Sequence, residues 1–135
     1  MSNQMIFLNL PARNLQESKD FWTKLGYSFN AQFSDERAAC LVFSDTIYAM
    51  LLTTEFFRTF TTKAVVDGRQ ATEAIVALSA DSRTAVDALV DRALAAGATE
   101  TRPALDQGFT YQRSFDDLDG HQWEIIWTDP AQVQS

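Results

Sequence analysis

The hydrophobic and polar positions along this chain follow the same series of patterns twice. Two unlike sets of residues alternate over 6–11, with Ile6, Leu8 and Leu10 in one set and Phe7, Asn9 and Pro11 in the other, which predicts a strand with two unlike faces. An amphipathic stretch then runs to Gly26. The same order returns in the strand-like run 74–79 and in an amphipathic stretch that ends at Gly97. Phe7 and Ile75 hold equivalent places, about half of the 135-residue chain apart. Such a repeat predicts two comparable structural units.

The first amphipathic stretch has the sequence features of a capped helix. Asn14 can serve as the N-cap, and Glu17 three residues later completes a capping-box pattern. The buried stripe is expected to consist of Leu15, Ser18, Phe21, Trp22 and Leu25. We expect strands to follow near 38–43 and 46–52, joined by a turn at 44–45, with a further strand around 27–33.

The second copy predicts the same elements with a longer helix. Asp81 or Ser82 can cap this helix, and its buried stripe is expected to consist of Val86, Leu89, Val90, Ala93 and Leu94. Strands are expected near 100–102, 110–115 and 122–128, with a strong turn pattern at 116–120. Each copy is therefore a βαβββ module, and the fold class is α+β.

We expect a single domain over 1–135, because each copy is too short to form an independent core. Module one covers about 4–53 and module two about 73–130, with a connecting segment at 54–72. That segment carries Phe56, Phe57 and Phe60, which is more aromatic mass than a solvated linker would have. It should pack in part as a short helix or as a lid.

The alternation within strands assigns their two faces. The helix of each module should cover the more apolar set, which consists of Ile6, Leu8, Leu10, Ala74, Val76, Leu78, Ala80, Trp123, Ile125 and Trp127. The opposite set then consists of Phe7, Asn9, Ile75, Ala77, Ser79, Gln122, Glu124 and Ile126. Two modules with one apolar sheet face each can hide those faces against each other, which predicts a cleft with a pocket. Glu124 is then a single carboxylate among mostly uncharged neighbours.

Composition excludes several classes of function. The net charge of −7, with 11 scattered Lys and Arg residues, argues against nucleic-acid binding. No apolar run approaches the roughly 20 residues of a membrane span, and the N-terminus lacks an export signal, so we expect a soluble cytoplasmic protein without a membrane partner. The one cysteine, Cys40, allows neither an internal disulfide nor a thiolate cluster for zinc, and is interpreted as a buried thiol.

The order of these pieces resembles the vicinal oxygen chelate superfamily, which contains glyoxalases, bleomycin-resistance proteins and extradiol dioxygenases. The resemblance covers nearly the whole chain and looks closest to the uncharacterised glyoxalase-like branch. It rests on residues 7–11 leading to 14–18, on Phe21-Trp22 with Leu25-Gly26, and on residues 115–124. It implies paired βαβββ modules that form a cup around a divalent metal.

The resemblance also implies where metal ligands would stand. The four positions fall on Phe7, on or near Met50, on Ile75 and on Glu124. Only Glu124 can bind a hard or borderline cation, and one carboxylate supplies neither the charge nor the coordination number. We therefore expect no metal and no other cofactor. The lone His121, on the opposite strand face from Glu124, and Asp116, Asp117 and Asp119 in the turn are interpreted as structural.

Two alternatives stay open for Glu124. Without a cationic partner in apolar surroundings it would favour the protonated form and could exchange protons as a general base does. Paired with Arg113 on the neighbouring strand it would stay ionised and structural, and the register of the hairpin decides which face Arg113 takes. A role as an anchor for a polar ligand group is also open.

The cup lining implied by the resemblance includes Tyr48, Met50 and Leu52, beside Phe7 and Ile75. Tyr111 and Arg113 would add a hydroxyl and a guanidinium at the mouth. This lining suits a small, mainly apolar or aromatic molecule with one or two polar groups. Alternatively, the same side chains fill the cup as core.

Three functional hypotheses follow. The first is a metal-free, glyoxalase-like protein that binds a small molecule and forms a homodimer, with Phe7, Asn9, Tyr48, Met50, Ile75, Tyr111, Arg113 and Glu124 as ligand-binding residues. The second is an enzyme, a lyase, isomerase or dioxygenase, with Glu124 as its catalytic residue or as one of its metal ligands. The third is a structural or interaction module with a filled cup.

Overall fold

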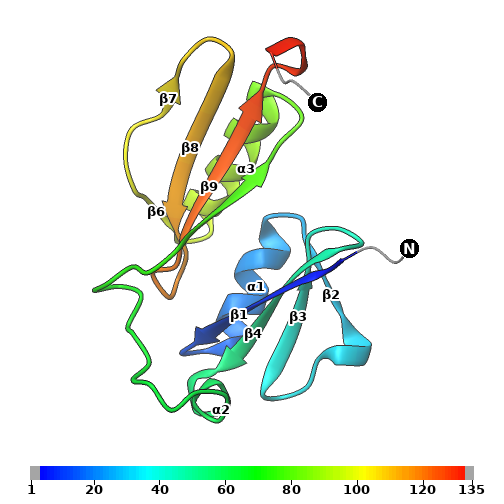
Figure 1. Cartoon of the computed structure of the whole chain (residues 1–135), viewed down its shortest axis with the longest axis vertical. Coiled ribbons are helices and arrows are strands. Elements are labelled where there is room, and N and C mark those ends of the chain that lie inside the picture. Colours follow the sequence, from blue (N-terminus) through cyan, green and yellow to red (C-terminus); the bar gives the residue numbers. More distant parts are fainter. Residues whose placement is uncertain (1–3, 133–135) are drawn as a thin grey trace. The chain divides into compact units, whose positions relative to one another are not determined.

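The computed structural model describes residues 4–132, which form two compact units that meet in sequence between Val65 and Val66. Each unit combines one mixed β-sheet with one long helix, as Figure 1 shows for the blue-to-cyan and the green-to-red parts of the chain. The chain therefore has the α+β class that the two patterns predicted. Its organisation as one domain, with the module boundaries given above, stays a prediction.

The first unit is a βαβββ module. Its elements are β1 (Ile6–Ala12), α1 (Leu15–Lys24), β2 (Ser28–Asn30), a 3₁₀ turn (Ala31–Phe33), β3 (Ala38–Val42), β4 (Ile47–Thr53) and α2 (Thr54–Arg58). The strand order is β1-β4-β3-β2, with β1 parallel to β4 and the other neighbours antiparallel. Strand β1 therefore forms one edge of its sheet.

Helix α1 begins and ends where the sequence predicts. The Asn14 side chain accepts a hydrogen bond from the backbone N–H of Glu17 at 3.0 Å, which satisfies one of the free donors of the first turn. Gly26, with φ +102°, follows the helix in the left-handed conformation that glycine adopts without strain. Phe21 and Trp22 are buried, and Trp22 makes edge contacts with Tyr27 and Phe43. An aromatic cluster thus seals the helix side of the first sheet.

The second unit repeats this order with one additional short strand, β7. Its elements are β5 (Ile75–Ser79), α3 (Arg83–Ala95), β6 (Thr99–Glu100), β7 (Leu105–Asp106), β8 (Thr110–Asp116), β9 (Gln122–Thr128) and a 3₁₀ turn (Pro130–Gln132). The order is β5-β9-β8-β6, β5 is parallel to β9, and β7 also pairs with β8. The two-residue strand β7 was not expected.

The core of the second unit lies between α3 and one face of its sheet. Ser82 is the N-cap, since its hydroxyl accepts from the backbone N–H of Ala85 at 3.0 Å. Val86 and Val90 of α3 are fully buried, as are Trp123 and Ile125 of β9. The helix-facing set of β9 is therefore the one that strand parity predicts. Among the described residues, no helix is long and apolar enough to cross a membrane.

The connecting segment contains α2, a short helix of the kind expected there. Thr53 caps it, because its hydroxyl accepts a 3.3 Å hydrogen bond from the backbone N–H of Phe56. The Phe56 ring packs edge-on against Phe60, with ring centroids 5.0 Å apart, and lies under the Arg37 guanidinium at 4.2 Å. Phe56 therefore packs within the first unit, although Phe60 remains exposed.

Candidate functional site

The open face of the first sheet, on the side away from α1, carries a pair of stacked rings. Phe7 and Tyr48 are register partners in β1 and β4, and their ring centroids lie 5.1 Å apart with an interplanar angle of 9°. The Phe7 side chain is 51% exposed even so. The two rings therefore form an aromatic platform on which a planar molecule can stack.

The polar groups beside this platform bond to nearby backbone. The Asn9 amide donates to the carbonyl oxygen of Phe7 at 3.1 Å, and the Tyr48 hydroxyl donates to the carbonyl oxygen of Asp45 at 2.9 Å. Met50 is the register partner of Asn9 on one side and of Cys40 on the other. Burial raises the pKa of the Cys40 thiol, which makes it less reactive. This face is therefore mainly apolar.

The open face of the second sheet carries Glu124, and its cationic partner is Arg102. Glu124 lies between Ala77 of β5 and Ser114 of β8 in the ladder, and Ile75 lies farther along β5 on the same face. The Nη2 atom of Arg102 is 2.6 Å from Oε2 of Glu124, and the two side chains are 43% and 18% exposed. The sequence left open whether Glu124 has a cationic partner, with Arg113 as the candidate. The partner in the structure is Arg102, which the sequence did not suggest for this role.

Tyr111 and Arg113 lie on the opposite face of this sheet, which corrects their expected place at the mouth beside Glu124. Their register partners are Trp127 and Ile125, which belong to the helix-facing set. The Tyr111 hydroxyl donates to the Asp87 carboxylate at 2.6 Å, and the Arg113 guanidinium bonds to Asp87. The β8–β9 register decides the face, and the sequence does not fix that register.

Arg113 is the centre of an ion network between α3 and β8. Its side chain is 12% exposed and bonds to Asp87, Asp91 and Glu100 at 2.9–3.0 Å. Burial disfavours its charge, but these three carboxylates raise the pKa of Arg113 overall. The hydrogen bond from Tyr111 lowers the pKa of Asp87, and the same bond raises the pKa of Tyr111. The network joins helix to sheet and leaves no ligand role for Arg113 on the Glu124 face.

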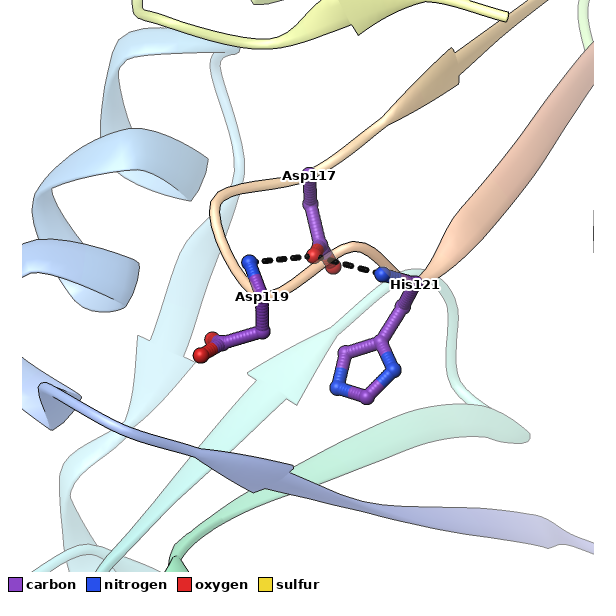
Figure 2. A group of neighbouring side chains, drawn as sticks. All are labelled: Asp117, Asp119 and His121. Carbon is purple, nitrogen blue, oxygen red and sulfur yellow. Dashed lines mark hydrogen bonds between the residues drawn. The ribbon is translucent and has the colours of Figure 1, made fainter. Parts of the chain in front are cut away.

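The turn between β8 and β9 gathers Asp117, Asp119 and His121, whose potential ligand atoms all lie within 4.8 Å of one another (Figure 2). Asp117 Oδ1 accepts hydrogen bonds from the backbone N–H groups of Asp119 and His121, as Figure 2 shows, and Oδ2 accepts from Trp123 Nε1 at 2.9 Å. Burial raises the pKa of Asp117. Both oxygens of this carboxylate thus hold the turn together, which is the structural role expected for it.

A glycine contact fixes this turn against the segment that precedes β5. Gly120 has φ +82°, and a Cβ placed on it would lie 2.6 Å from the Cα of Arg69 and would also overlap the backbone of Gly68. A Cβ on Gly68 would in turn lie 2.7 Å from the carbonyl oxygen of Asp119. Two backbones therefore touch directly here, which requires glycine on both sides.

The residues at the four positions implied for a metal do not fit a divalent ion. In the first unit these positions hold Phe7 and Met50, which offer no hard donor atom. In the second unit they hold Ile75 and Glu124, and the carboxylate of Glu124 is bonded to Arg102. A transition metal requires three or four nitrogen, oxygen or thiolate ligands, so no catalytic step is assigned to a metal at these positions.

Sequence reasoning missed two residues of the Glu124 face, Arg102 and Ser114. Arg102 follows the short strand β6 in an irregular segment, so strand parity does not apply to its side chain. Ser114 is a small polar residue in a run that otherwise reads as an ordinary strand. One feature of the sequence could have pointed to both residues. Residues 100–102 and 110–115 were expected to form strands in the same module as Glu124, which places Arg102 and Ser114 near it.

Known proteins identify this architecture. A hypothetical protein from S. aureus shares 20% sequence identity, with a TM-score of 0.79 over 94% of this chain and 95% of that one. A bleomycin resistance determinant encoded on the transposon Tn5 has 18% identity and a TM-score of 0.66 over 94% and 99% of the two chains. The fosfomycin resistance protein FosX from Mesorhizobium loti has 13% identity and a TM-score of 0.70 over 98% of each chain. At these identities the likeness shows the fold alone.

The sequence itself assigns the family. Among curated protein sequences, none is significantly similar to this chain. The model of the Glyoxalase/Bleomycin resistance protein/Dioxygenase superfamily, in contrast, matches residues 4–125, which is most of the 135-residue chain. The two βαβββ modules and their strand orders agree with that assignment. The chain therefore belongs to the glyoxalase/bleomycin resistance protein/dioxygenase superfamily.

Proposed function

We propose that this protein binds a small, largely apolar or aromatic molecule on its open sheet faces and does so without the metal-ligand set of its superfamily. The observation that carries the proposal is the stacked pair of Phe7 and Tyr48, because adjacent exposed rings on a sheet face form a contiguous apolar surface of the kind that marks a ligand-binding site. The face that carries Ile75, Ala77 and Glu124 supports it further, since it combines apolar surface with one charged anchor.

Catalysis by Glu124 has less support than binding. A general base must be free to accept a proton, and the Glu124 carboxylate is engaged by the Arg102 guanidinium at 2.6 Å. A metal-dependent lyase, isomerase or dioxygenase would need ligands that Phe7, Met50 and Ile75 do not supply. Glu124 therefore enters the proposal as an anchor for a polar ligand group.

The ligand-binding set is narrower than the sequence predicted. Phe7, Tyr48 and Met50 remain in it for the first sheet, with Asn9 beside them through its amide. Ile75 and Glu124 remain for the second sheet. Tyr111 and Arg113 are left out, because their polar groups bond to α3 on the other face.

A titration of the ¹⁵N-labelled protein with a panel of one-ring and two-ring aromatic compounds tests this function. Bound compounds should shift the amide signals of Phe7 and Tyr48, or those of Ala77 and Glu124, more than those of the helices. The Phe7→Leu variant should bind the same compounds about two- to tenfold more weakly, since an aromatic pair contributes about 0.5–1.5 kcal/mol beyond its buried area.

Phe33→Leu is the matched control, because Phe33 is also an exposed phenylalanine of the first unit but lies in the 3₁₀ turn after β2. It should bind like the unmodified protein. A panel that shifts no signal on either face, or that shifts them equally in both variants, would contradict the proposal.

We also propose that the protein is a homodimer. The support is the apolar character of the exposed residues Ile6 and Ile47, which are register partners at the start of β1 and β4 and remain open to solvent. Light scattering after size exclusion should give twice the 15.1 kDa chain mass. Ile47→Asp should shift the protein to the monomer, and a monomer mass for the unmodified protein would end this proposal.

A further inference from the structure

Ser114 is an orphaned hydroxyl on the Glu124 face. Within residues 4–132 it is the buried side-chain oxygen for which no hydrogen-bond partner is found, and the residue is 1% exposed. Native proteins rarely bury a hydroxyl unpaired, because water would otherwise satisfy it. Ser114 is the direct register partner of Glu124, so its side chain stands beside that carboxylate on the same face.

Arg102 reaches Glu124 by crossing the strand that carries Ser114. The backbone N–H of Thr101 donates to the carbonyl oxygen of Ser114 at 3.3 Å, which places Arg102 on the β6 side of β8. Glu124 lies on β9, and β8 is the strand between β6 and β9. The Arg102 side chain must therefore pass over β8 close to Ser114.

The arginine is the more exposed partner of this ion pair, and the carboxylate belongs to a central strand of the sheet. Glu124 belongs to β9, which has a hydrogen-bonded neighbour on each side, β5 and β8. Arg102 lies in the irregular segment between β6 and β7, and its side chain is 43% exposed. Ion pairs with such exposure add little to stability. Arg102 can therefore leave Glu124 without disturbing the sheet.

We propose that Arg102 occupies a cation subsite formed by Glu124 and Ser114, and that the ammonium, amidinium or guanidinium group of a ligand binds there in its place. This inference rests on the proposed function, and it names the class of molecule that the second sheet accepts. That molecule is a small amine, amidine or guanidine with a short apolar or aromatic body, which would lie against Ala77 and Ile75.

The charge of the ligand follows from the group that it replaces. Once Arg102 withdraws, a neutral or anionic ligand would leave Glu124 without a counter-charge. Asp116, two residues after Ser114 on the same face of β8, adds a second carboxylate nearby. A cation restores the ion pair. Its N–H groups can also donate to the Ser114 hydroxyl, for which the structure holds no partner, while Arg102 itself leaves that oxygen unsatisfied.

Benzamidine and its uncharged isostere benzamide are suitable probes, each titrated into the ¹⁵N-labelled full chain. Benzamidine should shift the amide signals of Ala77, Ser114 and Glu124 in the unmodified protein. Arg102→Met keeps the apolar stem but removes the competing charge, so its benzamidine affinity should rise about two- to fivefold. Ser114→Ala should lower that affinity, and Glu124→Gln should abolish it, with benzamide unaffected by any of the three changes.

Arg58→Met is the control for net charge, because it removes one positive charge from α2 in the other unit. It should leave benzamidine binding unchanged. An equal gain in Arg58→Met and Arg102→Met, or no gain in Arg102→Met with dispersed native spectra, would overturn the cation subsite. In those cases binding of neutral aromatic compounds would still uphold the proposed function. The absence of any response to every compound would overturn both.

Discussion

The Tyr111 hydroxyl donates a 2.6 Å hydrogen bond to the Asp87 carboxylate, and this contact joins strand β8 to helix α3. The two residues were not expected to meet, since Tyr111 was assigned to the ligand-binding face. Their contact means that the surface between α3 and β8 is polar at its margin and apolar at its centre, where Val86 and Val90 are buried. The stability of the second unit should therefore depend on the state of ionisable groups.

Removing the hydroxyl in Tyr111→Phe should lower the free energy of unfolding by about 0.5–1.5 kcal/mol. We expect a loss near the lower end of this range, because the Asp87 side chain is 47% exposed and water can take the place of the lost hydroxyl. Tyr48→Phe is the matched control, because the Tyr48 hydroxyl donates to an uncharged backbone carbonyl at an exposed site. Urea titrations of both variants should show the larger loss for Tyr111→Phe. A larger loss for Tyr48→Phe would contradict the network.

The same contact predicts how the free energy of unfolding changes at low pH and at high pH. The lowered pKa of Asp87 adds stability that is present above its ordinary value of 3.8 and is lost as the pH falls through the lowered value. The raised pKa of Tyr111 adds stability that is present below its ordinary value of 10.0 and is lost as the pH rises through the raised value. Unfolding free energies measured from pH 2 to 12 should therefore decline less steeply at both ends in Tyr111→Phe. Parallel profiles of the two proteins would refute this linkage.

Gly120→Ala should destabilise far more than Gly108→Ala. Both glycines have positive φ, +82° and +85°, so each alanine pays a similar backbone strain of about 1 kcal/mol. A Cβ on Gly108 meets nothing within 4 Å, whereas a Cβ on Gly120 would overlap the backbone of Gly68 and Arg69. We expect an additional loss of about 1–3 kcal/mol in Gly120→Ala. Equal melting temperatures for the two variants would show that the glycine contact does not exist in solution.

Arg83→Lys should loosen the β7–β8 hairpin selectively. The Arg83 guanidinium bonds to both oxygens of Asp106 and to the carbonyl oxygen of Gly108, and it lies over the rings of Tyr111 and Trp127. Lysine keeps the charge but cannot reproduce this planar fork. Amide hydrogen exchange should become faster at 105–110.

Exchange at 122–124 of β9 should stay the same in that variant, because this end of the strand pairs with β5 and with residues 114–116 of β8, away from this contact. Arg92→Lys, a change of the same kind on the same helix, is the control. Uniformly faster exchange throughout the second unit would indicate that Arg83 stabilises the whole unit and does not act locally.

The sequence predicted those parts of the fold that local interactions decide. The Asn14 cap, its bond to Glu17 and the glycine that ends the helix lie within one short segment, so the pattern contains all of the information. The helix-facing residues of β9 were correct for the same reason, because alternation along one strand is local. Recognition of the superfamily followed from the order of these pieces.

The sequence could not predict contacts that depend on register or on irregular backbone. The sequence left open whether Arg113 pairs with Glu124. In the structure Arg113 faces α3, because the β8–β9 register is set by the turn in which Asp117 accepts three N–H bonds. Arg102 follows a two-residue strand, and nothing in its neighbours indicates that its side chain crosses β8. The candidate site was therefore identified by its carboxylate but not by the groups around that carboxylate.

The two long helices, α1 and α3, are attached to their sheets through different kinds of contact. Helix α1 packs through its Trp22 ring against the rings of Tyr27 and Phe43, whereas the margin of α3 depends on the charges around Arg113, including the 67% exposed Asp91. Dissolved salt screens such exposed charges and leaves ring packing nearly unchanged. The halves of a duplicated chain would then respond unequally to ionic strength, so guanidinium chloride and urea should differ in which half they loosen first.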